Sequence, residues 1–204
     1  MATANIVNGD QTVNGTLTAS QLSGPLNSSN LSQDASIAFP IPLTGFRIWD
    51  AFQTVLPGTS SGDDIGIATG TWGSALPHLV TATTGAPTTY YARTFVQLPP
   101  RYVAGASAVL RFAAGMGTAA AGACTLDCEA YLSARDTLVS GSDLVTTAAT
   151  SINSLTFANT DFVLTATNLV AGSWLDVRIA IALTAGSSGY GRIAHAELLC
   201  TIKG

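Results

Sequence analysis

The clearest pattern in the chain is a strict alternation of branched aliphatic residues with other residues between positions 173 and 184. The aliphatic positions are Leu175, Val177, Ile179, Ile181 and Leu183. Because successive side chains of a strand point to opposite faces, this spacing gathers them on one face. The positions between them hold Trp174, Asp176, Arg178, Ala180 and Ala182. The segment is therefore predicted to be a central strand with one buried face and one mixed face, and the mixed face is expected to be partly covered by another chain.

The rest of the sequence from residue 36 onward repeats this behaviour in shorter stretches separated by Gly, Pro, Ser and Asp turns. The segment 39–43 carries two prolines, which suit an edge or entry segment. In the last strand we expect one face to hold Ile193, His195, Glu197, Leu199 and Thr201. Residues 143–149 leave room for a short helical turn. The expected strands cover residues 46–52, 78–83, 89–98, 108–116, 123–134, 154–157, 162–166 and 190–201. Residues 63–70 are expected to lead into a further strand or a short connector.

No long helical pattern interrupts these strands. About eight to ten short strands with regular turns predict an all-β fold, an antiparallel β-sandwich, over residues 36–204. Among such sandwiches the pattern favours a jelly roll.

Residues 1–35 are predicted to form an extended N-terminal arm or short stalk. Residues 6–11 and 12–17 form two hexads, each with an apolar or β-branched pair followed by Asn-Gly, which favours tight turns. Two hexads are too few to bury their own apolar face. Two interpretations remain: a flexible leader, or an arm that contacts neighbouring chains, attaches to a larger assembly or winds with two further copies. The second predicts partner contacts by Ile6, Val7, Val13, Leu17, Leu22 and Leu26.

Charged residues make up 10% of the chain, against about 25% in a typical soluble domain. A chain with so little charge is expected to cover much of its surface with partners, so we predict an obligate oligomer. No apolar run reaches the roughly 18 residues of a membrane span, and the N-terminus does not resemble a secretory signal. Lys203 is the sole lysine beside seven arginines and twelve acidic residues, a balance that argues against nucleic-acid binding.

Residues 58–62 match the Gly-x-Ser-x-Gly pattern of a nucleophile elbow. That motif needs a sharp strand-to-helix turn, and no helical pattern follows Ser60, so a polar loop is the preferred interpretation. His78 and His195 are the available bases. For His195 we expect a packed or interface imidazole. A hydrolase that uses Ser60 is kept only as a third hypothesis, and no catalytic residue is predicted.

Three cysteines do not form a disulfide framework or a zinc site. On one strand, Cys124 and Cys128 would lie about 13 Å apart, so all three, with Cys200, are expected to be buried free thiols. A pairing of Cys200 with one of the others stays open. Asp63 and Asp64 could contribute to a calcium site, but a solvated loop is preferred, and no metal or other cofactor is predicted.

Glycines and aromatic residues leave two further expectations. Gly115 and Gly117 do not fit a phosphate-binding loop and are expected to permit close backbone approach. Most of the aromatic residues are expected in the core or an interface, with a sugar-binding platform as the alternative. They are Trp49, Trp72, Trp174, Tyr90, Tyr91, Tyr102, Tyr131 and Tyr190.

Several stretches resemble virion structural proteins of tailed bacteriophages. Residues 7–19 (VNGDQTVNGTLTA) resemble the arms and shaft starts of fibre and capsid-decorating proteins. The body segments 98–105, 110–116 and 171–179 resemble jelly-roll modules of such proteins.

The resemblance implies a non-enzymatic virion component, commonly a homotrimer, attached through its N-terminal part and assembled in the host cytoplasm. The main hypothesis is a capsid-decorating protein, of cement or head-fibre type, with the major capsid protein or another virion protein as its partner. The alternative is a receptor- or glycan-binding module of a phage tail fibre or spike.

Overall fold

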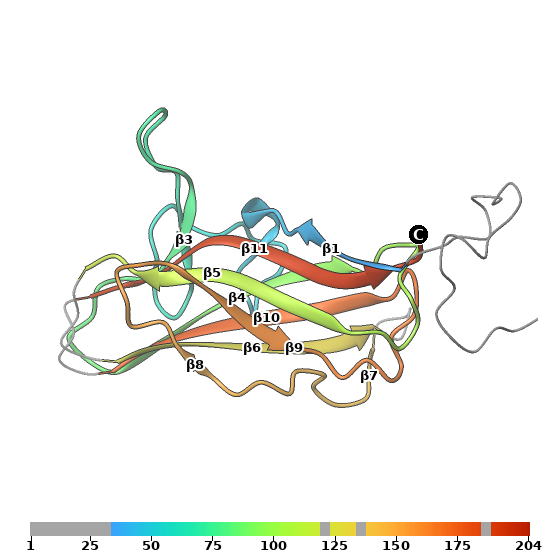
Figure 1. The fold of residues 1–204 in the computed structure, drawn as a ribbon. Coiled ribbons are helices and arrows are strands. Elements are labelled where there is room, and N and C mark those ends of the chain that lie inside the picture. The colour runs from blue at the N-terminus through green and yellow to red at the C-terminus, as the bar shows by residue number, and fades with distance from the viewer. Residues whose placement is uncertain (1–33, 119–122, 134–137, 185–188) are drawn as a thin grey trace, which may run out of the picture. The chain divides into compact units, whose positions relative to one another are not determined.

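The computed structural model describes residues 34–118, 123–133, 138–184 and 189–204, and these form two antiparallel sheets packed face to face (Figure 1). The larger sheet contains β1 (Ala35–Pro40), β2 (Gly66–Ala68), β3 (His78–Val80), β5 (Ala108–Met116), β9 (Ala158–Val163) and β11 (Gly191–Ile202). The smaller sheet contains β4 (Thr88–Gln97), β6 (Cys124–Ser133), β7 (Val139–Ser140), β8 (Thr150–Ser151) and β10 (Trp174–Leu183).

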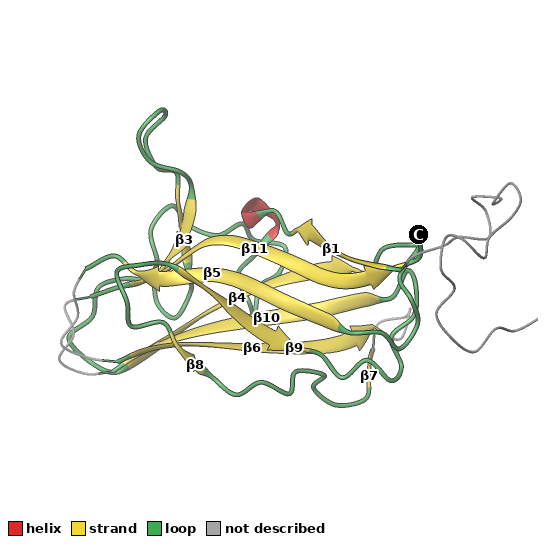
Figure 2. Ribbon diagram, viewed as in Figure 1, coloured by secondary structure: helices red, strands yellow, loops and turns green. Residues whose placement is uncertain are grey.

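Helical structure in the described residues is limited to a 3₁₀ turn, η3 (Leu43–Gly45), as Figure 2 shows. None of the described segments forms a helix long and apolar enough to cross a membrane.

The strand order confirms the predicted jelly roll. In the six-stranded sheet the order is β2-β3-β11-β5-β9, with β1 also paired to β11, and in the five-stranded sheet it is β4-β10-β6-β7, with β8 paired to β6. The long strands β4, β5, β6, β9, β10 and β11 therefore belong alternately to the two sheets. This crossing from sheet to sheet is the connectivity of a jelly roll.

The predicted central strand is confirmed as β10, which pairs with β4 on one side and β6 on the other. Its five aliphatic side chains are at most 2% exposed and face the core between the sheets. Full burial of each such side chain contributes about 1.5–3 kcal/mol relative to exposure. The alternation of β10 therefore fixes which face of the five-stranded sheet is dry and which is wet.

In the last strand, β11, the residues that share the buried face differ from those expected. Ile193 is fully buried, but farther along the strand the buried residues are Ala196, Leu198 and Cys200. The register with β5 shifts between Ile193 and His195. One extra residue at this bulge switches which of the alternating side chains point toward the core. Ile193 thus faces the core, whereas the other four residues expected beside it face outward. His195 is exposed, so it is not packed in the core of this chain, and its expected place in an interface stays a prediction.

The predictions for three short segments are also wrong. Residues 46–52 do not form a strand, because Phe46 follows the η3 turn and only Arg47 makes isolated bridges, to Val55 and Arg93. Residues 154–157 are a bend that crosses Gly115, and the strand β9 begins after it at Ala158. Residues 143–149 contain no helical turn, and Val145 there makes an isolated bridge to Leu164.

The expected close approach at two glycines is confirmed within the chain. A Cβ atom on Gly115 would lie 2.6 Å from the Phe157 ring, and one on Gly117 would lie 2.2 Å from the Tyr190 ring. Both distances are far shorter than van der Waals contact, so these positions cannot hold a larger residue unless the rings move.

The predictions for the N-terminal arm, including its six partner-contact residues, fall on residues 1–33, which lie outside the described residues.

The three cysteines are free and buried, as expected, with exposed fractions of 0% for Cys124, 2% for Cys128 and 1% for Cys200. Burial raises the pKa of Cys124 to about 11 and raises the pKa of Cys200. The pKa of Cys128 is raised well above its ordinary value by burial and then by nearby carboxylates. Since the thiolate is the reactive form, these side chains are poor nucleophiles in the folded protein.

Replacing Ile179 by alanine should destabilise the fold by about 2–5 kcal/mol, because the fully buried side chain would leave a cavity at the centre of β10. Urea denaturation followed by fluorescence measures this change. The matched control is Val170→Ala, at a residue that is 47% exposed, which should change the free energy of unfolding by less than about 0.5 kcal/mol. Equal effects of the two substitutions would contradict the assigned core.

The native protein should fail to react with Ellman's reagent at pH 8, because with a pKa of about 11 the Cys124 thiol is ionised to roughly 0.1%. In denaturant all three thiols should react at the rate of a free cysteine. Rapid labelling of the native chain would show that a cysteine-bearing strand opens, and mass spectrometry of the labelled peptides would identify it.

Candidate functional site

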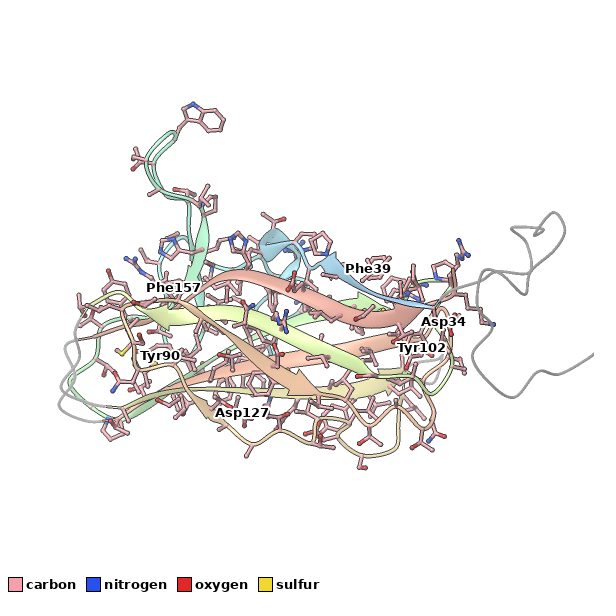
Figure 3. All side chains as sticks on the ribbon, in the orientation of Figure 1. Asp34, Phe39, Tyr90, Tyr102, Asp127 and Phe157 are labelled. Atoms are coloured by element: carbon pink, nitrogen blue, oxygen red, sulfur yellow. The ribbon has the colours of Figure 1, made fainter. Side chains whose placement is uncertain are left out.

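The outer face of the five-stranded sheet carries polar and aromatic side chains between the buried aliphatic positions. On β10 the outward residues include Asp176, Arg178, Ala180 and Ala182, and the antiparallel register sets the neighbours of each. Arg178 lies opposite Arg93 on β4 and Glu129 on β6. Ala180 lies opposite Tyr91 on β4 and Asp127 on β6, and Asp127 is seen on the outer side of the sheet in Figure 3.

Two arginine–carboxylate pairs bridge these strands. Arg93 binds Asp176 with both forks of its guanidinium, and the Nε–Oδ1 distance is 2.6 Å. This hydrogen bond raises the pKa of Arg93. Arg178 Nη2 donates to Glu129 Oε2 at 2.6 Å. Each pair is about one third exposed on its arginine, so the charges remain accessible to a ligand.

An aromatic pair lies beside the second ion pair. The rings of Trp49 and Tyr91 are 5.2 Å apart at an angle of 46°. The Arg178 guanidinium carbon lies 5.4 Å from the Trp49 ring and 5.1 Å from the Tyr91 ring, within the range of cation–π attraction. The indole Nε1 of Trp49 donates to Asp63 at 3.3 Å. Contacts on several sides therefore hold Trp49 in the segment that had been expected to be a strand.

A second aromatic pair repeats the arrangement around Arg93. Phe52 and Phe95 pack edge to face with their centroids 5.0 Å apart. The Arg93 guanidinium carbon lies 5.4 Å from the first ring and 5.7 Å from the second. Both arginines of the face are thus fixed by a carboxylate and by a pair of rings.

These side chains line a shallow groove made of two adjoining hollows of about 270 and 410 Å³, which share Glu129 and Arg178. Ala180 and Ala182 line the first hollow, where their small side chains leave room above the sheet. Trp49 and Tyr131 line the second. The lining of both together carries four carboxylates (Asp50, Asp127, Glu129, Asp176) and two guanidinium groups (Arg93, Arg178). We call this feature the sheet groove.

The aromatic residues considered for a sugar platform divide between different places. The sheet groove brings together Trp49, Tyr91 and Tyr131. Trp174 is exposed at the start of β10 on the same face, whereas Tyr90 and Tyr102 are buried (Figure 3). Trp72 is fully exposed in the loop between β2 and β3, which projects from the sandwich in Figure 1. The alternation placed Asp176 and Arg178 on the mixed face of the central strand, but it did not indicate their partners Arg93 and Glu129, which lie 83 and 49 residues away along the chain.

The Ser60 motif forms a polar loop, as the preferred interpretation expected. No helix follows it: residues 61 and 64 form an isolated bridge, and β2 comes next. The Ser60 hydroxyl donates to the Asp64 carbonyl oxygen at 2.5 Å. His78 lines the same pocket as Ser60, but its Nδ1 donates to the Leu76 carbonyl oxygen at 3.0 Å, and no carboxylate among the described residues orients the ring as in a triad.

Asp63 makes a side-chain contact within the protein, whereas the Oδ1 atom of Asp64 is buried without a hydrogen-bond partner among the described residues. Asp63 accepts the Trp49 hydrogen bond, and burial, followed by the charges of Asp63 and Asp50, raises the pKa of Asp64. Within the described part of the chain, no three potential metal ligands come together. The geometry of the described residues therefore does not support a calcium site at Asp63 and Asp64.

Comparison with known proteins shows similarity to solved structures only. No family model matches the chain, and no curated protein matches it. The similar structures include a "Family 16 Carbohydrate Binding Module-2", with 11% identity and a TM-score of 0.39, covering 67% of this chain and 86% of that one. They also include the xylan-binding module CBM15, with 12% identity and a TM-score of 0.40, covering 81% of this chain and 97% of that one.

A third similar structure is an Arthrobacter globiformis T6 isomalto-dextranase complexed with panose, with 17% identity and a TM-score of 0.43. The match covers 80% of this chain and 23% of that enzyme. Identities and TM-scores this low assign the chain neither a family nor a function. The candidate function is argued below from the sheet groove.

Proposed function

We propose that the chain is a non-enzymatic binding module that holds a neutral glycan in the sheet groove. The observation that carries the proposal is the Trp49–Tyr91 ring pair, which lies beside the Arg178–Glu129 ion pair where the two hollows of the sheet groove adjoin. A sugar ring presents an apolar C–H face together with hydroxyl groups that both donate and accept. A ring stacked on an aromatic side chain, with its hydroxyls against a guanidinium and a carboxylate, satisfies both requirements.

The balance of charge in the groove favours a neutral ligand. Four carboxylates against two guanidinium groups line the two hollows, so an anionic ligand would meet net repulsion. Carboxylates accept hydrogen bonds from hydroxyl donors, and the arginines donate to hydroxyl oxygens. An uncharged polyhydroxylated ligand can use both kinds of partner.

The same contacts argue against acid catalysis by the two ion-paired carboxylates of this groove, Glu129 and Asp176, although Asp50 and Asp127 line it without an arginine partner among the described residues. A glycosidase needs one carboxyl group that is free to protonate the leaving group. Glu129 and Asp176 both accept hydrogen bonds from arginines, so proton donation would have to break an ion pair. This arrangement suits recognition better than acid catalysis.

The glycan proposal agrees with the alternative function expected from the sequence. Some solved structures of similar fold are titled as carbohydrate-binding modules, but the proposal rests on the groove. Whether the module belongs to a phage tail fibre or spike stays a prediction. The capsid-decorating role, the homotrimer and the virion location also stay predictions, because no family model and no curated protein matches the chain.

Trp49→Ala and Tyr91→Ala should each weaken glycan binding by at least about tenfold, because each removes one ring of the stacking pair. A glycan array with the unaltered chain identifies the ligand, and isothermal titration calorimetry compares the variants. The matched control is Trp72→Ala, which removes a fully exposed indole outside the groove and should leave the affinity unchanged.

Two outcomes would contradict the proposal. One is the absence of any glycan hit with correctly folded protein. The other is a hit whose affinity falls with Trp72→Ala but not with Trp49→Ala, since the ligand would then bind at the projecting loop. Thermal unfolding of each variant separates loss of binding from loss of fold.

A further inference from the structure

A separate hollow, of about 500 Å³, lies on the outer face of the six-stranded sheet, and we call it the β3–β11 pocket. It is lined by residues of the loop 58–60, of β2 and the loop that follows it, of β3 and of the start of β11. Its volume is in the range of pockets that hold small ligands. It shares no lining residue with the sheet groove.

The electrostatic character of this pocket is opposite to that of the groove. Its lining includes Arg192 and His78 but no aspartate or glutamate. Val80 pairs with both Arg192 and Gly66, and His78 lies two residues before Val80 on the same outward face. Leu79 between them is fully buried, which confirms that both basic side chains face outward.

Arg192 lacks the carboxylate partner that the other strand arginines have. Among the described residues, Arg93 pairs with Asp176, Arg178 with Glu129, and Arg111 with Asp161 and Glu197. No described carboxylate lies within ion-pair distance of Arg192, and its Nε atom is buried without a hydrogen-bond partner in the described structure. A guanidinium group with too few acceptors is unfavourable in the free protein and gains most from an incoming anion.

Tyr190 holds the Arg192 guanidinium in place without neutralising it. The Nη2 atom donates to the Tyr190 hydroxyl oxygen at 2.6 Å, and the guanidinium carbon lies 4.7 Å from the centre of the ring. The ring itself lies close against Gly117, where a Cβ atom would be 2.2 Å away. Two hydrogen bonds between Thr81 and Gly191, of 3.0 and 3.1 Å, fix β3 beside β11. The cation is therefore positioned before any ligand arrives.

Hydroxyl groups complete the lining. The side chains of Thr59, Thr71 and Thr83 make no hydrogen bond within the described part of the chain and are exposed at the pocket. His78 directs its Nδ1 hydrogen to the Leu76 carbonyl oxygen, which leaves Nε2 as its remaining polar atom. The pocket thus offers one fixed cation, one imidazole and several hydroxyl donors.

From these observations we infer that the β3–β11 pocket binds a small ligand through an oxyanion, either a carboxylate or a phosphate, held by Arg192 with His78 beside it. The inference is independent of the glycan proposal, because it uses different residues on the other sheet. A carboxylate would come from an acidic sugar or a similar small acid, and a phosphate from the free ion or a phosphorylated compound. The test separates these sources.

The test titrates the full chain with three probes by isothermal titration calorimetry: galacturonate, inorganic phosphate and galactose. Galactose has the same ring as galacturonate without the carboxylate, so it reports any contribution of the sheet groove. We expect an oxyanion to bind the unaltered chain, and the affinity for it to fall roughly tenfold or more in Arg192→Gln. The charge-matched control is Arg101→Gln, an exposed loop arginine that contacts the backbone oxygen of Gly204.

Each outcome decides the matter. Binding of galacturonate alone assigns a carboxylate ligand, binding of phosphate alone assigns a phosphate, and binding of both assigns a general oxyanion site. Failure of both anions to bind, or equal binding by the unaltered chain and Arg192→Gln, overturns the inference.

If Arg192→Gln does not fold, His78→Gln and Tyr190→Phe replace it, and unchanged anion binding in both would also overturn the inference. Trp49→Ala should leave anion binding unchanged, so failure here is distinguishable from failure of the glycan proposal.

Discussion

The constraint on which the rest of the structure depends is the registered pairing of β10 between β4 and β6. A strand has a side-chain period of two, so a slip of one residue would turn the buried aliphatic side chains outward and the charged ones into the core. Burying Asp176 or Arg178 without its partner would cost several kcal/mol, which makes such a register inaccessible. The core therefore fixes the register, and the register in turn fixes the rows of outward side chains. The sheet groove is a consequence of the packing on the other side of the same strands.

The sequence predicted the architecture well where the two-residue period was long. The strands around residues 89–98, 108–116, 123–134 and 173–184 were all predicted within one or two residues, and together they are enough to indicate a sandwich. It failed where a local contact overrides the period. In β11 the bulge after Ile193 changes which alternate residues face the core, and the sequence pattern before the bulge does not predict the extra residue. Residues 46–52 are rich in aromatic side chains because these pack against Arg93 of β4 and Arg178 of β10, which the pattern alone cannot distinguish from a strand.

The candidate site was predicted less well, for a physical reason. The sequence identified Trp49, Tyr91 and Tyr131 as candidates for a sugar platform, but it could not distinguish them from core residues such as Tyr102. What separates the two groups is which strand lies next to which, and strand order is set by long-range pairing. Arg178 meets Glu129 only because β6 adjoins β10, although 49 residues separate them along the chain. Periodicity gives the face of a residue, and topology gives its neighbours.

The sheet groove and the β3–β11 pocket differ in how their cations are balanced, and this difference separates the ligands that we propose for them. In the sheet groove each arginine already has a carboxylate and a pair of aromatic rings, so its geometry is fixed and its charge is compensated before binding. Such preorganised groups lose little conformational entropy when a ligand binds, and their compensated charge suits uncharged partners that offer only hydroxyl groups. In the β3–β11 pocket Arg192 is fixed by Tyr190 but keeps its full charge, and the lining supplies no acid to reduce it. An uncompensated cation discriminates strongly in favour of anions, because a neutral ligand cannot supply the missing charge. The same type of side chain, on strands of the same sandwich, is thus suited to two classes of ligand by the presence or absence of a neighbouring carboxylate.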